Sequence, residues 1–272
     1  MFVILGAAFV LFSPSIVLAI EFILMHRQHR GHPVHPTRAT MLMRVWFAET
    51  LIALRVFLWE QAFRSRSEPD NFWALPGKRP VLLIHGYMCN RGFWNSWMRR
   101  LRYGGVPYCA VTLEPAFGSI DDGIDALELA VREVMLATGL APLIVAHSMG
   151  GLTVRAWMRK YPTEDRAHHV VTIASPHGGT WLARYGISRN ARQIRIGSSW
   201  LDDLSRSEPR SRYRRFTCFY GHCDNVAFPM DRVILPGADN RHVEAAAHIQ
   251  MALRDEVFHE VIRLLDTQQV LE

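Results

Sequence analysis

The sequence predicts an α/β fold in which a mostly parallel sheet is flanked by helices. After Pro76 and Gly77, short β-branched apolar segments alternate with segments of helical periodicity, a pattern typical of a parallel sheet covered by helices. The composition agrees, because 49% apolar and 21% charged residues in a chain of 272 are enough for one sizeable domain and an appendage. A disordered chain, a collagen and a disulfide scaffold are excluded.

The N-terminal segment is predicted to be a membrane anchor. Residues 1–20 contain no charge, and apart from Glu21 the apolar character continues to Met25. At about 1.5 Å per residue, a helix of this length can cross the ~30 Å core of a bilayer. Arg27 and Arg30 follow the apolar segment instead of preceding it, so the pattern favours an anchor over a cleaved secretory signal.

A second apolar segment, residues 41–63, includes the charged side chains Arg44, Glu49, Arg55 and Glu60. Four charges at about 2.5–3.5 kcal/mol each near the bilayer centre outweigh the gain from the apolar residues. We therefore expect a helix that lies at the membrane interface or packs on the folded domain. The orientation depends on this choice, since one span leaves the domain in the cytoplasm and two spans leave it on the far side.

Six apolar segments are predicted to be strands, and the segments of helical periodicity lie between and after them. The strands are expected at Val81–Ile84, Tyr108–Thr112, Leu143–Ala146, Val170–Ile173, Phe216–Tyr220 and Val233–Leu235, and the last helix at Met251–Leu265. The predicted layout is a transmembrane anchor at 1–25, an interfacial helical linker at 26–72 and an α/β domain at 73–272 with a short basic cap segment at 180–215.

Positive charge gathers in two zones of the chain. Residues 1–66 have seven arginines and three glutamates, and residues 180–215 have nine arginines and three acids, within a formal net charge of +6. These arginines lie beside apolar segments and are not interleaved with aromatic residues as in a nucleic-acid platform. A membrane surface is therefore the expected anionic partner, and nucleic acid is not expected to bind.

The sharpest motif is Ala146-His147-Ser148-Met149-Gly150, an apolar strand that runs into a serine and then into small residues. A serine on a tight strand-to-helix turn faces outward, and the residues two positions away must be small, as Ala146 and Gly150 are. This is the form of a nucleophile elbow, although alanine stands at 146 where glycine is usual. Ser148 is the candidate nucleophile.

A second strand ends in His85-Gly86-Tyr87, the place from which such folds supply another backbone donor. The amides of Tyr87 and Met149 are therefore candidates for an oxyanion hole. Ser148 also stands at the start of a helix, whose dipole favours negative charge there. His85 is expected to shape the loop and not to transfer protons.

A serine hydroxyl is a weak nucleophile unless a histidine and an orienting carboxylate assist it, and in this arrangement they follow in the order Ser, acid, His. Asp224 is the favoured acid because it lies in the loop after the strand at 216–220, at the edge where parallel sheets build sites. The less favoured acids are Asp231, Asp202 and Asp203.

His248 is the favoured base because it comes just before the terminal helix, on a loop directed back toward the sheet edge. His242 is the alternative, and it lies in a polar, turn-like segment. No metal site is expected, since Cys218, His222 and Cys223 have no second ligand pair at a structural zinc spacing. The four cysteines are expected to be buried free thiols.

Together these motifs resemble bacterial triacylglycerol lipases and esterases of the α/β-hydrolase superfamily, over about residues 78–268. The resemblance is carried by Pro80–Gly86, Ala146–Gly151, Ser175–Thr180, Gly221–Pro229 and Ala247-His248. It implies the α/β-hydrolase fold, with Ser148 as nucleophile, His248 as base, Asp224 as acid, and Tyr87 and Met149 as oxyanion donors. The N-terminal 70 residues match no compact secreted lipase.

The predicted function is a membrane-anchored serine hydrolase of carboxylic esters, single-pass in the bacterial inner membrane, which needs no cofactor and acts on a lipid or small ester. Trp181 and Tyr185 in the basic cap segment are candidate substrate-binding residues. Two alternatives stay open: thioester hydrolysis or acyl transfer by the same three residues, and a catalytically silent membrane scaffold.

Overall fold

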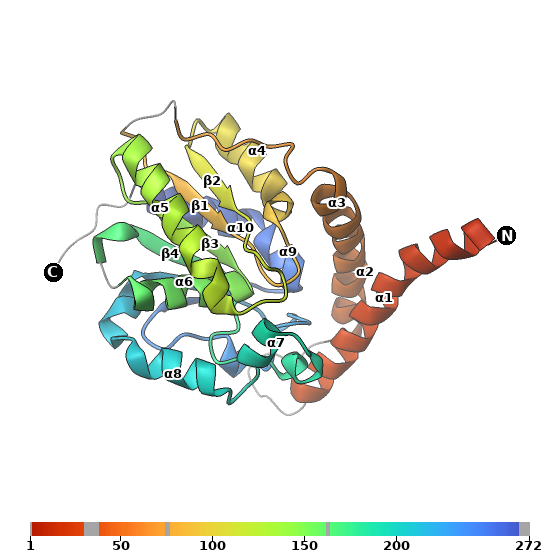
Figure 1. Cartoon of the computed structure of the whole chain (residues 1–272). Coiled ribbons are helices and arrows are strands. Elements are labelled where there is room, and N and C mark those ends of the chain that lie inside the picture. The colour runs from red at the N-terminus through yellow and green to blue at the C-terminus, as the bar shows by residue number, and fades with distance from the viewer. Residues whose placement is uncertain (1, 30–37, 74–76, 162–163, 267–272) are drawn as a thin grey trace.

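Six parallel strands form one sheet in the order β2-β1-β3-β4-β5-β6 in the computed structural model of the chain (Figure 1). The strands are β1 (Val81–Ile84), β2 (Tyr108–Val111), β3 (Leu143–His147), β4 (His169–Ile173), β5 (Phe216–Tyr220) and β6 (Asp239–His242). The structure describes residues 2–29, 38–73, 77–161 and 164–266, with side chains from residue 13 onward. The predicted parallel sheet flanked by helices is confirmed.

Helices cover both faces of the sheet, because successive side chains of each strand point to opposite faces. They are α4 (Asn95–Tyr103), α5 (Ile124–Thr138), α6 (Met149–Lys160), α7 (Arg189–Gln193), α8 (Ser199–Ser207), α9 (His248–Ala252) and α10 (Asp255–Leu265). One apolar cluster joins α5, α6 and α8 to the face that includes Leu82 and Ile144. The other joins α4, α9 and α10 to the face that includes Leu83 and Val145.

The sixth strand is not where the sequence analysis placed it. Val233–Leu235 is not a strand, and β6 is the polar segment Asp239–His242, which pairs with β5. A strand at the edge of a sheet is paired on one side and is partly solvated, so its residues need no apolar pattern. Asn240 ties the two segments together, since its side chain accepts from the Leu235 amide and donates to the Leu235 carbonyl, each at 2.9 Å.

The strand order changes direction between β1 and β3. The chain leaves β1 through α4 to β2 on one side, whereas it leaves β3 through α6 to β4 on the other. Open α/β sheets bind ligands at such a switch point, in the crevice at the carboxyl ends of the strands. Ser148 directly follows β3 and Gly86 lies two residues after β1, so both sequence motifs face this crevice.

The later part of α1 (Phe2–His29) packs beside α2 (Ala39–Arg55) on the α/β domain, whereas the first part of α1 extends away from the domain (Figure 1). We call these two helices the N-terminal hairpin. α2 continues through a π-helical segment at Val56–Glu60 into the short α3 (Gln61–Phe63). Leu18 is buried in a cluster that includes residues of the sheet, and the Trp46 indole donates to the Ser15 carbonyl at 3.1 Å.

Within the described part of the chain, no helix combines the length and the apolar character that crossing a bilayer requires. The transmembrane anchor predicted at residues 1–25 is therefore not supported, and the side chains of residues 1–12 lie outside those described. The later part of this segment packs on protein instead, since Phe22 and Met25 are buried against Phe228 and its neighbours. The second apolar segment packs on the domain, one of the two arrangements that its charges predict.

The basic cap segment at 180–215 folds between β4 and β5 and is fixed to α6 by a buried ion pair. The Arg155 guanidinium lies 2.6 Å from the Glu208 carboxylate, and these side chains are 1% and 0% exposed. The Tyr213 hydroxyl also donates to Glu208 at 2.9 Å, and Arg155 donates to the His177 carbonyl at 2.9 Å. The charges are thus enclosed and fully hydrogen-bonded, which is what makes such a pair tolerable in a core.

Replacement of Glu208 by glutamine is expected to destabilise the fold by about 3–5 kcal/mol, because it leaves the buried Arg155 charge without its counter-ion. Urea unfolding followed by circular dichroism measures this loss. Asp203→Asn is the matched control, since Asp203 is exposed and its pair with Arg206 spans 3.8 Å. Equal stability of the two variants would contradict the role given to the buried pair.

Candidate active site

Ser148 lies at the turn between β3 and α6. Its φ of 55° and ψ of −128° fall in a region that non-glycine residues rarely adopt, as expected for a strained nucleophile elbow. Gly150 permits the close approach that this turn needs, since a Cβ there would lie 2.6 Å from the His85 carbonyl oxygen. The Ser148 amide donates to the Ile173 carbonyl at the end of β4, at 2.8 Å.

Three side chains from distant parts of the sequence meet at this turn. The Nε2 atom of His248 lies 2.9 Å from the Ser148 hydroxyl, and its Nδ1 atom lies 2.9 Å and 3.1 Å from the two carboxylate oxygens of Asp224. All three residues are buried. The Asp224 carboxylate is itself oriented by the amides of Val226 and Ala227, which donate to Oδ1 at 2.9 Å and 2.8 Å.

The alternative acids and base lie elsewhere. His242 is hydrogen-bonded to His222, with a distance of 2.8 Å between the two rings. Asp231 pairs with Arg232 at the surface, as Asp203 pairs with Arg206. The structure therefore brings together the favoured residues and not these alternatives. His248 is the first residue of α9 and not part of a loop, and the predicted terminal helix is divided into α9 and α10.

The two predicted oxyanion donors flank Ser148. Met149 is the first residue of α6, and a Cβ on Gly86 would lie 2.8 Å from the Cβ of Ser148, so the Tyr87 amide follows a residue in contact with the serine. Among the described residues, neither the Tyr87 amide nor the Met149 amide donates to a protein acceptor. Free amides beside a nucleophile can stabilise a negatively charged oxygen.

Two further histidines, His85 and His147, lie beside the site, and both are neutral. The Leu113 amide donates to Nε2 of His85 at 2.9 Å, and burial lowers the pKa of His85 to about 4. His147 lies 3.0 Å from the His248 carbonyl through Nε2, stacks on Phe93, and has its pKa lowered well below the ordinary value by burial. Both rings position backbone around Ser148, and His85 has the loop-shaping role expected of it.

Glu49 of α2 is a site residue that the sequence analysis missed. It is fully buried, and its carboxylate accepts from the amides of Ile249 at 2.7 Å and Gln250 at 3.0 Å. These amides belong to the first turn of α9, which His248 begins. Burial raises the pKa of Glu49 to about 7, although the two amides oppose the rise. A lone acid in an apolar helix was the signal in the sequence.

Asn225 and Glu21 connect α1 to the same site. The Asn225 side chain accepts from the His248 amide at 3.2 Å and donates to the Glu21 carboxylate at 2.6 Å. Burial raises the pKa of Glu21 to about 7. Both N-terminal helices thus place an ionisable carboxyl group near His248, a contribution that the motifs of the α/β domain did not indicate.

The pKa of His248 is raised above its ordinary value. Burial alone lowers this pKa, but the charge and the hydrogen bond of Asp224 raise it, and Glu49 and Glu21 add to the rise. A base acts while it is neutral, so kcat/KM is expected to fall as the pH drops through a value above 6.5.

An apolar cavity of about 510 Å³ opens at Ser148, within the usual size range of ligand pockets. The N-terminal hairpin and the adjoining π-helical segment supply one part of its lining, including Val17, Leu18, Ala53, Leu54, Phe57 and Leu58. The α/β domain supplies the rest, including Gly86, Tyr87, Ser148 and His248. A substrate in this cavity would therefore contact both the hairpin and the domain.

The predicted substrate-binding residues of the basic cap segment do not line this cavity. Trp181 stacks on Phe228, with 5.9 Å between ring centroids, and contacts Tyr185 edge to face. Tyr185 is largely exposed. Leu182 is the residue of this segment that reaches the cavity. A role of Trp181 and Tyr185 in substrate binding therefore stays a prediction.

No group of three or more His, Cys, Asp or Glu side chains in the described ranges is arranged to hold a metal ion. Cys89, Cys109, Cys218 and Cys223 are free thiols. Burial raises the pKa of Cys89 to about 12, and it does the same for Cys218. These thiols are therefore protonated at neutral pH and are not candidates for the nucleophile.

Comparison with known proteins identifies the family. The model of the alpha/beta hydrolase family matches residues 81–265, more than half of the chain. The chain belongs to the alpha/beta hydrolase family. The resemblance stated from its motifs is confirmed, and the N-terminal hairpin precedes the matched region of this hydrolase. Comparison with the sequences of curated proteins finds no match.

Solved structures similar to this hydrolase include several lipases. The mature lipase BlEst2 of Bacillus licheniformis has a TM-score of 0.62 and 18% identity, over 70% of this chain and 93% of that one. Lipase B of Aspergillus fumigatus has a TM-score of 0.57 and 18% identity, over 66% and 49%. The monoacylglycerol lipase of Paleococcus ferrophilus has a TM-score of 0.52 and 17% identity, over 70% and 95%. At these identities the likeness establishes the fold.

Replacement of Glu49 by glutamine is expected to shift the acid limb of the kcat/KM profile to lower pH. Glutamine keeps one acceptor for α9 but removes a carboxylate that raises the pKa of His248. A pH profile with a soluble ester measures the shift. Glu60→Gln is the control, since Glu60 is also buried but bonds to Asn95 and Arg99, away from His248. An identical profile for wild type and Glu49→Gln would refute this effect.

Proposed function

We propose that this hydrolase cleaves carboxylic esters of apolar acids through an acyl-enzyme on Ser148. The observation that carries the proposal is the hydrogen-bonded series from Ser148 through His248 to Asp224, with 2.9 Å at each step, beside an apolar cavity that Ser148 and His248 line. Such a series activates a serine for attack on an acyl carbon.

In the proposed reaction the Ser148 oxygen attacks the ester carbonyl carbon while its proton passes to Nε2 of His248. The amides of Tyr87 and Met149 stabilise the resulting oxyanion, and Asp224 holds the imidazolium. His248 then gives the proton to the departing alkoxide, which leaves as an alcohol. Water attacks the acyl-enzyme, again losing its proton to His248, and the carboxylic acid departs as Ser148 recovers its proton.

The acyl chain is proposed to occupy the cavity between the hairpin and Ser148, because the lining there is largely aliphatic and aromatic. Apolar burial gains about 0.8 kcal/mol per methylene. We therefore expect kcat/KM to increase from acetate through butyrate to decanoate in a series of p-nitrophenyl esters. A maximum at acetate would exclude this use of the cavity.

Replacement of Leu54 by tryptophan tests the cavity itself. The larger ring is expected to lower the decanoate-to-acetate ratio of kcat/KM by about tenfold or more, because a filled pocket excludes a long chain. Leu51→Trp is the matched control, since Leu51 lies one turn away on α2 and is 54% exposed. Equal ratios in the two variants would show that the acyl chain binds elsewhere.

We also propose that the hairpin rests on a lipid surface. Its outward side exposes the large apolar residues Ile16, Ile20, Ile23, Met43, Phe47 and Leu51. Contiguous exposed apolar surface is typical of membrane or protein contact sites. Ile20→Asp with Leu51→Asp is expected to abolish flotation with phosphatidylcholine vesicles, and unchanged flotation would reject the proposal.

A further inference from the structure

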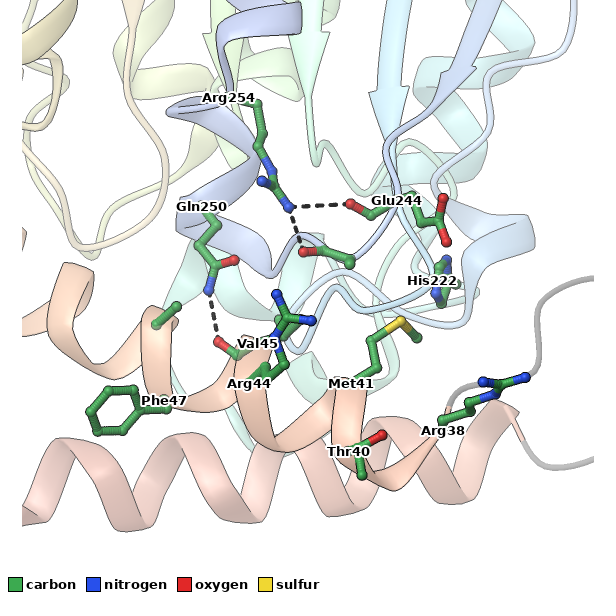
Figure 2. Close-up of a pocket in the computed structure, with 12 residues that line it drawn as sticks. Arg38, Thr40, Met41, Arg44, Val45, Phe47, His222, Glu244, Gln250 and Arg254 are labelled. Carbon is green, nitrogen blue, oxygen red and sulfur yellow. Dashed lines mark hydrogen bonds between the residues drawn. The ribbon is translucent and has the colours of Figure 1, made fainter.

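A second cavity, of about 920 Å³, lies between the N-terminal half of α2 and the loops after β5 and β6 (Figure 2). We call it the arginine cavity. It is lined by Arg38, Thr40, Met41, Arg44, Val45, Phe47, Ala48, His222, Glu244, Ala245, Gln250 and Arg254. None of these residues lines the cavity at Ser148, so the arginine cavity is separate from the proposed acyl site.

Three arginines line this cavity, and none of them forms an ion pair with an acid of the described residues. Arg44 from α2 and Arg254 from the segment before α10 extend into it from opposite sides (Figure 2). Arg254 donates to the carbonyl oxygens of Glu244 and Ala245, at 3.3 Å and 2.6 Å. Among the described residues, neither Arg38 nor Arg44 makes an ion pair, and Glu244 is the single acid in the lining.

Several other arginines at the surface of the domain are paired with acids. Arg166, for example, pairs with Glu128 at 2.5 Å, and Arg91 pairs with Asp70 at 2.5 Å. Cations gathered around one cavity without enough counter-charge repel one another, and a bound anion relieves that repulsion. Guanidinium groups present planar sets of donors that match the oxygens of phosphate and carboxylate.

The apolar part of the lining indicates that the ligand carries an apolar group beside its anionic group. Met41 and Phe47 border the cavity. Phe47 also belongs to the exposed stripe of α2 with Met43 and Leu51, which follow one another at intervals of four residues along one helical face. An anion that binds here therefore lies beside an apolar surface. A lipid headgroup at the edge of a bilayer has both properties.

We propose that the arginine cavity binds the phosphate of an anionic phospholipid while the hairpin rests on the bilayer. This inference depends on the lipid-surface part of the proposed function and not on the chemistry at Ser148. The cavity also borders the segments of the proposed acid and base, since His222 precedes Asp224 by two residues and Gln250 follows His248 by two. A bound headgroup would thus hold the membrane next to the catalytic loops.

The test measures binding in the Ser148→Ala variant, so that no turnover disturbs it and failure of the catalytic proposal leaves the result intact. The probes are monomeric dihexanoyl-phosphatidylglycerol and inorganic phosphate in calorimetry, and vesicles of phosphatidylcholine with or without phosphatidylglycerol in flotation. Adding Arg44→Gln is expected to weaken dihexanoyl-phosphatidylglycerol binding by about tenfold and to remove the extra flotation that phosphatidylglycerol causes.

Arg132→Gln is the matched control, because Arg132 is exposed on α5, has no ion pair among the described residues, and makes the same change in net charge. It is expected to leave both measurements unchanged. Thermal unfolding checks that each variant folds, and Arg38→Gln provides a second variant at the cavity. Equal effects of Arg44→Gln and Arg132→Gln would overturn the site. Inorganic phosphate binding as tightly as the lipid would overturn its assignment to a headgroup.

Discussion

Replacement of Ser148 by alanine is expected to lower kcat for ester hydrolysis by about 10⁵–10⁶, because the variant has no nucleophile to form the acyl-enzyme. The remaining turnover would come from the oxyanion donors and the bound geometry acting on water. The substitution is not expected to alter packing elsewhere in the fold, because the serine hydroxyl contacts His248 and the cavity. Steady-state kinetics with p-nitrophenyl butyrate measures the effect.

Ser175→Ala is the control for this variant. Ser175 is also buried and lies against Gly151 of α6, but within the described residues its hydroxyl makes no hydrogen bond to His248. Its replacement is expected to change kcat by less than about threefold, because the altered hydroxyl lies outside the hydrogen-bonded series. If Ser148→Ala kept its turnover and Ser175→Ala lost it, Ser148 would not be the nucleophile.

Replacement of Asp224 by asparagine is expected to lower kcat by about 10⁴. The asparagine amide would donate toward Nδ1 of His248, which favours the tautomer whose Nε2 atom carries the proton and cannot accept one from Ser148. The acid limb of the pH profile is expected to move to lower pH as well, because the carboxylate that raises the pKa of His248 is gone.

His242→Gln tests the alternative base in the same assay. His242 lies against His222 and contacts neither Asp224 nor Ser148 in the part of the chain that the structure describes. Its loss is expected to leave both kcat and the pH profile near those of wild type. An unchanged kcat in Asp224→Asn, together with a large loss in His242→Gln, would assign acid and base to other positions.

The sequence predicts the α/β domain well because its signals are local. A β-branched segment that ends in Ala-His-Ser-Met-Gly can adopt few conformations, and the small residues at 146 and 150 leave room for one tight turn. The motif residues Ser148, Asp224 and His248 are predicted for the same reason, since each follows a recognisable strand or precedes a helix. β6 could not be predicted in this way, because its pairing with β5, and not its own polar residues, makes it a strand.

The role of the N-terminal hairpin could not be predicted from its residues. An apolar helix has the same periodicity whether it faces lipid or a protein domain, so the choice between a span and a packed helix depends on what lies beside it. Glu49 is the clearest case, because its carboxylate is stable when buried only through the α9 amides about 200 positions further along the chain.

The central claim is that Ser148 is the nucleophile of a hydrogen-bonded unit with His248 and Asp224. Mass spectrometry of the folded chain after reaction with a fluorophosphonate tests it most directly, because the probe forms a stable bond with an activated serine. We predict one adduct, mapped to Ser148 by peptide analysis and absent from His248→Ala. An adduct on a different residue, or none on folded wild-type protein, would contradict the claim.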